Sequence, residues 1–100
     1  MDGTSTKDRP IIWENEKSKA CVLLVEDDPA LQCMVLDYFA ESSIRTLLAS
    51  NQREMADQLG SADVDLVILD LRLGPEDGLD LLRKIKSSSE LPVIIITGNR

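Results

Sequence analysis

The stretch Cys21-Val22-Leu23-Leu24-Val25-Glu26-Asp27-Asp28 joins an apolar run to three consecutive carboxylates. A second apolar run, Leu66-Val67-Ile68-Leu69, also ends in an acid, Asp70. Short runs rich in branched apolar residues are typical of parallel strands, because such strands are covered on both faces of the sheet. The two runs therefore predict two buried strands, each of which ends in carboxylates.

Parallel sheets bind their ligands at the carboxyl ends of the strands. If the strands at 21–26 and 65–70 are neighbours, Glu26, Asp27 and Asp70 meet at that edge. Two carboxylates about 4 Å apart repel by roughly 4 kcal/mol at the effective dielectric of a protein surface. A cation relieves this repulsion, and ligands that are all oxygen atoms suit Mg²⁺. The sequence thus predicts a Mg²⁺-binding pocket with one carboxylate available for chemistry.

Composition excludes several classes of function. One hundred residues, 43% of them hydrophobic, are enough for one small domain. The net charge of −7 argues against direct contact with nucleic acid, for which a basic patch is expected. The chain has no histidine, which excludes Ser-His-Asp catalysis and histidine-ligated zinc. Neither a signal peptide nor a transmembrane run is recognisable, so we expect a cytoplasmic protein without a membrane partner.

Predicted strands and helices alternate after a polar leader. Residues 1–19 are expected to be flexible, with one apolar island at 11–13. The expected strands are 21–26, 44–49, 65–70 and 91–97, and the expected helices begin at Asp28-Pro29, Asn51 and Asp77 and end near Glu41, Gly60 and Lys86. The order βαβαβαβ predicts an α/β fold with a doubly wound parallel sheet in the strand order 2-1-3-4. In that order the first and third strands are neighbours.

Apolar stripes on the helices are expected to form the core. The stripe of the first helix consists of Leu31, Met34, Val35, Tyr38 and Phe39. The stripe of the last helix consists of Leu79, Leu82 and Ile85. Polar residues at the helix starts, Asp28 and Asn51, are expected to be N-caps.

Together, these segments resemble the receiver domain of two-component response regulators. The matching stretches are Val-Leu-Leu-Val-Glu-Asp-Asp at 22–28, Asp-Leu-Val-Ile-Leu-Asp-Leu at 65–71, Asp-Gly at 77–78 and Leu-Pro-Val-Ile-Ile-Ile-Thr at 91–97. They stand in the order and at the separations that the family shows. The resemblance implies a flavodoxin-like fold and a signalling module that accepts a phosphoryl group on Asp70. The donor is then a sensor histidine kinase or a small phosphodonor.

The resemblance also implies roles for the residues around Asp70. Glu26 and Asp27 match the acidic pair that holds Mg²⁺ together with Asp70 and the main-chain carbonyl of Arg72. Thr97 matches the switch hydroxyl, which turns toward the phosphoryl group. The Glu-Asp-Asp motif at 26–28 and the Asp-Leu-Arg-Leu turn at 70–73 are most similar to those of receivers joined to winged-helix DNA-binding domains. The implied role is control of transcription through a domain that this chain does not contain.

Two features depart from the family pattern. Gly74 occupies the place, four residues after the phosphoacceptor, where receivers commonly carry proline, and Pro75 follows it. A receiver also continues with a fourth helix, a fifth strand bearing a lysine that pairs with the phosphoryl group, and a fifth helix. The sequence stops at Arg100, so we expect a partial receiver domain over 20–100 in which the fifth strand is absent. The fourth strand is then an exposed edge that can pair with a second copy of the chain.

Two alternative functions remain open at this point. An aspartyl-phosphate phosphohydrolase has the same sheet order, but it needs a second acid two residues after the nucleophile, where this chain has Arg72. A pure interaction fragment, unable to be phosphorylated, would follow from the missing lysine. We expect no enzymatic activity beyond self-phosphorylation and slow self-dephosphorylation.

Overall fold

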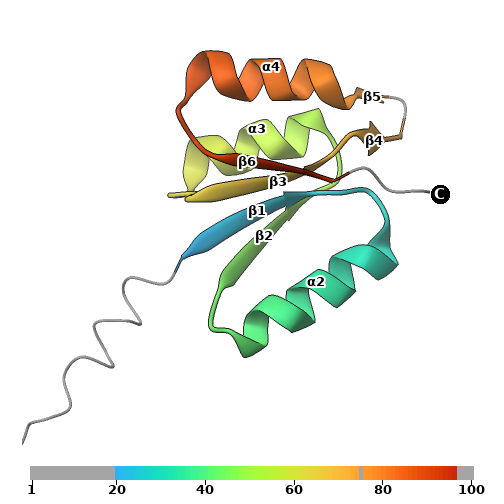
Figure 1. The fold of residues 1–100 in the computed structure, drawn as a ribbon, viewed down its shortest axis with the longest axis vertical. Coiled ribbons are helices and arrows are strands. Elements are labelled where there is room, and N and C mark those ends of the chain that lie inside the picture. The colour runs from blue at the N-terminus through green and yellow to red at the C-terminus, as the bar shows by residue number, and fades with distance from the viewer. Residues whose placement is uncertain (1–19, 75, 97–100) are drawn as a thin grey trace, which may run out of the picture.

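The structure is a computed structural model that describes residues 20–74 and 76–96. Along the chain its elements are β1 (Cys21–Val25), α2 (Pro29–Glu41), β2 (Arg45–Ala49), α3 (Gln52–Ser61), β3 (Leu66–Asp70), β4 (Arg72–Leu73), β5 (Glu76–Asp77), α4 (Gly78–Ser88) and β6 (Val93–Ile96) (Figure 1). The predicted leader, residues 1–19, lies outside the described residues.

Four of the strands form one parallel sheet in the order β2-β1-β3-β6. This order confirms the predicted arrangement 2-1-3-4, with β6 as the fourth strand. Val25 pairs with both Ala49 of β2 and Leu69 of β3, so these three strands end at the same edge. Among the described strands, β6 pairs with β3 alone and therefore forms a sheet edge, as predicted.

The hydrophobic core lies on the face of the sheet that α3 and α4 cover. Figure 1 shows these two helices on one side of the sheet and α2 on the other. The buried core residues are Leu23, Val25, Ala49, Met55, Val67, Leu69, Leu73, Leu81 and Ile85. Their strand members alternate along β1 and β3, because only every second side chain of a strand points to a given face.

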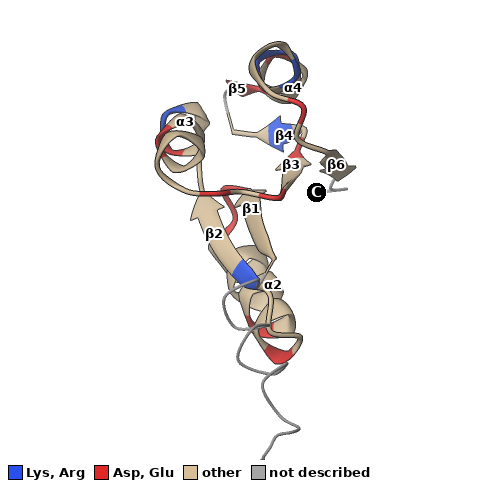
Figure 2. Cartoon of the chain, turned by 90° about the vertical axis from the view of Figure 1, so that its left-hand side faces the viewer, with Lys and Arg blue, Asp and Glu red and all other residues tan. Residues whose placement is uncertain are grey.

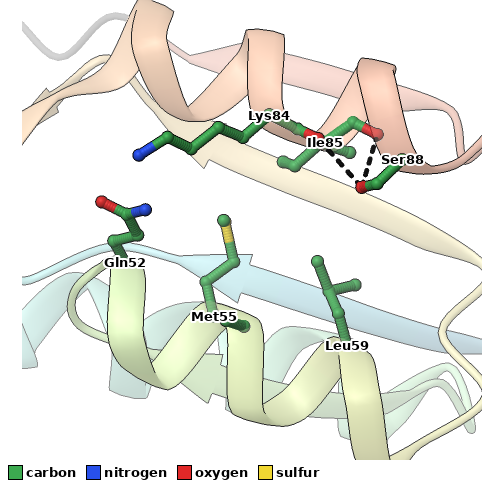
Figure 3. Close-up of a pocket in the computed structure, with 7 residues that line it drawn as sticks. Gln52, Met55, Leu59, Lys84, Ile85 and Ser88 are labelled. Atoms are coloured by element: carbon green, nitrogen blue, oxygen red, sulfur yellow. Dashed lines mark hydrogen bonds between the residues drawn. The ribbon is translucent and has the colours of Figure 1, made fainter.

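A pocket of about 230 Å³ separates α3 from α4. In Figure 3, Met55 and Leu59 of α3 point toward Ile85 of α4, while Gln52 and Lys84 stand at one end. Ser88 closes the other end and donates hydrogen bonds to the carbonyl oxygens of Lys84 and Ile85, at 2.9 and 3.5 Å. The floor of this pocket is thus part of the core itself.

The apolar stripe of α2 is not core, which corrects the prediction for this helix. No residue of α2 is buried, and Met34 and Tyr38 are 60% and 68% exposed. Together with Val35 and Phe39 they line an open apolar pocket of about 300 Å³. An apolar stripe is buried only where other elements cover both its flanks, and within the described residues α2 is the sole helix on its side of the sheet.

The inward face of α4 differs from the predicted one at Leu79, whereas Ile85 is buried and Leu82 packs against the core as predicted. Leu81 and Ile85 are each 1% exposed, whereas Leu79, which was predicted to point inward, is 48% exposed. The helix begins at Gly78, which is buried together with Leu81 and Ile85. At about 100° of rotation per residue, Leu79 lies off the face that these three positions define.

The helix starts confirm the predicted caps. Asp28 Oδ1 accepts a hydrogen bond from the Ala30 N–H at 2.9 Å, and Asn51 Oδ1 accepts one from the Glu54 N–H at 2.9 Å. The predicted stop of α3 at Gly60 is wrong by one residue. The helix continues to Ser61, where the Ser61 hydroxyl donates to the Asp57 carbonyl at 2.9 Å.

Leu81, which is buried, and Leu79, which is exposed, provide a test of how α4 packs. We expect Leu81→Ala to lower the free energy of unfolding by about 2–5 kcal/mol, because it opens a cavity in the core. Leu79→Ala is the matched control, and we expect a change within about 0.5 kcal/mol at this exposed position. Urea unfolding of both variants measures the difference, and equal losses would contradict the orientation of α4.

Candidate metal centre

Three carboxylates converge at the carboxyl ends of β1 and β3. Glu26 and Asp27 directly follow β1, and Asp70 is the last residue of β3. One oxygen of each side chain lies within 4.8 Å of the others. Figure 2 shows several acidic segments, in red, around β1 and β3 in the middle of the domain. The register that pairs Val25 with Leu69 brings the following residues of both strands side by side.

Two members of this cluster are withdrawn from water. Glu26 and Asp70 are both 0% exposed, whereas Asp27 is solvent-accessible. At a separation of 4.8 Å, two ionised carboxylates repel by about 3 kcal/mol at an effective dielectric constant near 20. A divalent cation bound between the carboxylates attracts each of them and offsets this repulsion. Three carboxylate oxygens are a suitable donor set for Mg²⁺, which prefers oxygen ligands and retains several of its waters.

Main-chain hydrogen bonds orient two of the carboxylates. The Asp28 N–H donates to Glu26 Oε2 at 3.0 Å, and the Arg72 N–H donates to Asp70 Oδ1 at 2.9 Å. Both bonds span two residues, so each acid is held by the chain segment that immediately follows it. The side chains are therefore set in place by local backbone before any ligand binds.

Gln32 supports the site, and the sequence analysis missed it. Its side-chain amide donates to the carbonyl oxygen of Glu26 and, at 3.1 Å, to the hydroxyl of Ser50. It thereby ties the first turn of α2 to the segments that follow β1 and β2. The only signal in the sequence was a polar residue directly after Leu31, the first member of the predicted apolar stripe.

A short hairpin follows Asp70, where the sequence analysis expected only a break at Gly74-Pro75. Its strands β4 and β5 are antiparallel, and Leu73 is 1% exposed. Glu76 Oε1 accepts a hydrogen bond from the Gln52 N–H of α3 at 2.8 Å, which anchors the hairpin to that helix. Gly74 has a positive φ of 55°. The segment that carries the Arg72 carbonyl is therefore a hairpin with a left-handed turn at Gly74, rather than the simple break that was predicted.

Thr97 lies outside the described residues. The strand that precedes it, β6, ends at Ile96, which pairs with Asp70. The Leu71 N–H donates to the Ile96 carbonyl at 3.1 Å, so the ends of β3 and β6 are joined at this edge. Asp77, the last residue of the hairpin, caps α4 by accepting a hydrogen bond from the Leu79 N–H at 3.0 Å.

The topology and the acidic edge define a doubly wound α/β domain with a cation-type site at the ends of its central strands. The family described as response regulator receiver domain matches residues 22–100, and the chain belongs to this family. The fold and the function predicted from the sequence, a receiver domain of two-component response regulators, are thereby confirmed.

Individual relatives agree with this assignment. The regulatory protein VirG of Agrobacterium tumefaciens (strain 15955) is 38% identical over 79 residues, which are 79% of this chain and 30% of VirG. A response regulator receiver protein from Pseudomonas putida superposes with a TM-score of 0.75 at 30% identity, covering 82% of this chain and 70% of that one. TrrA of Thermotoga maritima, solved in complex with Mg²⁺-BeF, superposes with a TM-score of 0.72 at 26% identity, covering 80% and 70% of the two chains.

Membership of the family carries several general properties. Receiver domains are signalling modules rather than enzymes, they bind Mg²⁺ at an acidic site, and sensor histidine kinases phosphorylate them. The chain is homologous to transcriptional regulators such as VirG and BaeR, and it spans about a third of the length of the curated relatives it matches. None of the described helices has the length and apolar character needed to cross a membrane.

The acidic cluster predicts stabilisation by Mg²⁺. At a Mg²⁺ concentration ten times the Kd, we expect about 1.4 kcal/mol of added stability, because the cation binds the folded cluster alone. For a domain of this size, the melting temperature then rises by roughly 5–10 °C.

Thermal unfolding with and without Mg²⁺ measures the effect. We expect Asp27→Asn to abolish most of the rise, whereas Asp57→Asn, at an exposed site on α3, keeps it. A melting temperature that ignores Mg²⁺ in the unmodified chain would contradict an assembled cation site.

Proposed function

We propose that this chain is a phosphoacceptor module in which Asp70 takes a phosphoryl group with the help of Mg²⁺. The observation that carries the proposal is the fully buried Asp70 carboxylate, with an oxygen within 4.8 Å of oxygens of Glu26 and Asp27. In this proposal Glu26, Asp27, Asp70 and the main-chain carbonyl of Arg72 are the metal ligands. Thr97 is the switch hydroxyl that turns toward the phosphoryl group.

The reaction is a phosphoryl transfer to a carboxylate. A carboxylate oxygen of Asp70 attacks the phosphorus of the donor, forming an O–P bond as the bond to the leaving group breaks. The leaving group departs with the bonding electrons, as acetate from acetyl phosphate or as imidazole from phosphohistidine. The hydrogen bond from the Arg72 N–H holds the carboxylate in one orientation during the attack. When bound, Mg²⁺ would neutralise the negative charge on the phosphoryl oxygens.

The biological role that we propose is control of transcription. VirG, BaeR and TorR, the relatives named as regulatory proteins, are about three times as long as the matched segment. We therefore assign the output to a domain outside this chain, of the winged-helix class. The phosphoryl donor in this proposal is a sensor histidine kinase or a small phosphodonor, and the chain acts in the cytoplasm. The net charge of −7 supports a receiver that makes no nucleic-acid contact of its own.

Incubation with acetyl phosphate and Mg²⁺, followed by intact-mass measurement, tests the phosphoacceptor. We expect a mass gain of one phosphoryl group that Asp70→Asn abolishes and that chelation of Mg²⁺ greatly reduces. Asp63→Asn, at an exposed position before β3, is the matched control and should retain the adduct.

The same experiment separates the alternatives. Multiple turnover of an added phosphomonoester would instead indicate a phosphohydrolase. Absence of any adduct in a folded chain would leave the interaction fragment, and an adduct that persists in Asp70→Asn would place the acceptor elsewhere.

We also propose that two copies of the chain associate through β6. Ile94 and Ile95 are 48% and 36% exposed on this edge strand, which carries no charged residue. Uncharged apolar edges pair readily with other strands, because their unpaired N–H and C=O groups are available. A second copy offers a strand of identical pattern.

Sedimentation over a range of protein concentrations tests this association. We expect a concentration-dependent dimer, and we expect Ile94→Lys to shift the chain to a monomer because a charged edge strand resists pairing. The same substitution at an exposed helix position, Leu79→Lys, is the control and should leave the dimer intact. A compact monomer at high concentration would contradict the pairing.

A further inference from the structure

Gly74 lies against one of the acidic side chains. A β-carbon added at this position would stand 3.1 Å from Oδ2 of Asp27, closer than side chains ordinarily approach each other. Its φ of +55° is in the left-handed region, which residues with a side chain rarely adopt. Both the space and the backbone conformation at this turn therefore favour glycine.

The hairpin that contains Gly74 is held in place by its other contacts. Glu76 is bonded to the first turn of α3, and Leu73 is packed in the core. Gly78 lies directly on the main chain of Leu71, where an added β-carbon would be 2.5 Å from the Leu71 Cα. The hairpin is thus fixed on several sides, so a side chain at position 74 would displace Asp27 more readily than the hairpin.

We propose that Gly74 is a positioning residue for the cation site and that it acts through the carboxylate of Asp27. The proposal rests on the proposed function, because it requires that Asp27 be a metal ligand. A β-carbon at position 74 pushes Oδ2 of Asp27 by a few tenths of an ångström. Mg²⁺ requires near-octahedral ligands at 2.0–2.1 Å, whereas Ca²⁺ accepts flexible coordination at 2.3–2.6 Å. In the left-handed backbone conformation that this chain has at position 74, the absence of a side chain therefore favours the smaller ion.

The selectivity between the two ions distinguishes positioning from a general structural effect. We expect Gly74→Ala to weaken Mg²⁺ binding by about threefold to tenfold. Binding of Ca²⁺ should weaken by less than half of that factor, because Ca²⁺ tolerates the displaced oxygen. A loss of folding alone would weaken both ions equally.

A second variant separates the effect of the added β-carbon on Asp27 from the effect of backbone strain at a positive φ. Asparagine tolerates a positive φ far better than alanine does, yet it carries a β-carbon. If the contact with Asp27 matters, Gly74→Asn lowers the affinity for Mg²⁺ as much as Gly74→Ala does. It should, however, lower the stability of the metal-free chain less than Gly74→Ala. Gly60→Ala is the matched control, because nothing lies within 4 Å of the added carbon, and it should leave both affinities unchanged.

The experiment is a titration of the whole chain and its three variants with MgCl₂ and CaCl₂, followed by thermal unfolding. A loss of Mg²⁺ affinity that exceeds the loss of Ca²⁺ affinity in both Gly74 variants supports the proposal. Equal Mg²⁺ affinity in Gly74→Ala, full recovery in Gly74→Asn, or equal losses for the two ions would overturn it. Failure of the unmodified chain to bind either ion would instead overturn the proposed function on which it rests.

Discussion

The parallel pairing of β1 with β3 is the constraint on which the rest of the structure depends. It places the ends of two buried strands next to each other, and with them the carboxylates of Glu26 and Asp70. Gathering these charges costs about 3 kcal/mol for each close pair. Full burial of a single leucine contributes about 1.5–3 kcal/mol, so the apolar residues of the same two strands, Leu23 and Leu69 among them, offset that cost. The same pairing of β1 with β3 thus produces both the hydrophobic core and the acidic site.

The parts of the fold that follow from periodicity could be predicted from the sequence. Continuous apolar runs mark the central strands, and the alternation with helices restricts the sheet to a few orders, of which 2-1-3-4 is the one found. The convergence of Glu26, Asp27 and Asp70 follows directly, because residues at the ends of neighbouring parallel strands share an edge. Polar caps such as Asp28 are equally visible, since their effect lies within three residues.

The features that escaped prediction depend on contacts between distant segments. The stripe of α2 looked like core, but burial of Met34 and Tyr38 requires a covering element that no helical period reveals. The β4–β5 hairpin is too short to show a pattern, and Gln32 acquires its role only when the ends of β1 and β2 meet. The left-handed turn at Gly74 is similarly defined by its approach to Asp27, a residue far away in the sequence.

The unequal cover on the two faces of the sheet has a consequence for motion. On one face, α3 and α4 share a core with the strands; on the other, α2 contributes no buried side chain. Segments with few buried contacts open at lower free energy than the rest of a domain. Because Gln32 in the first turn of α2 donates a hydrogen bond to the main-chain carbonyl of Glu26, partial opening of this helix would loosen the segment that carries Glu26 without melting the core. Amide exchange in α2 therefore measures how often the segment that carries Glu26 is loosened.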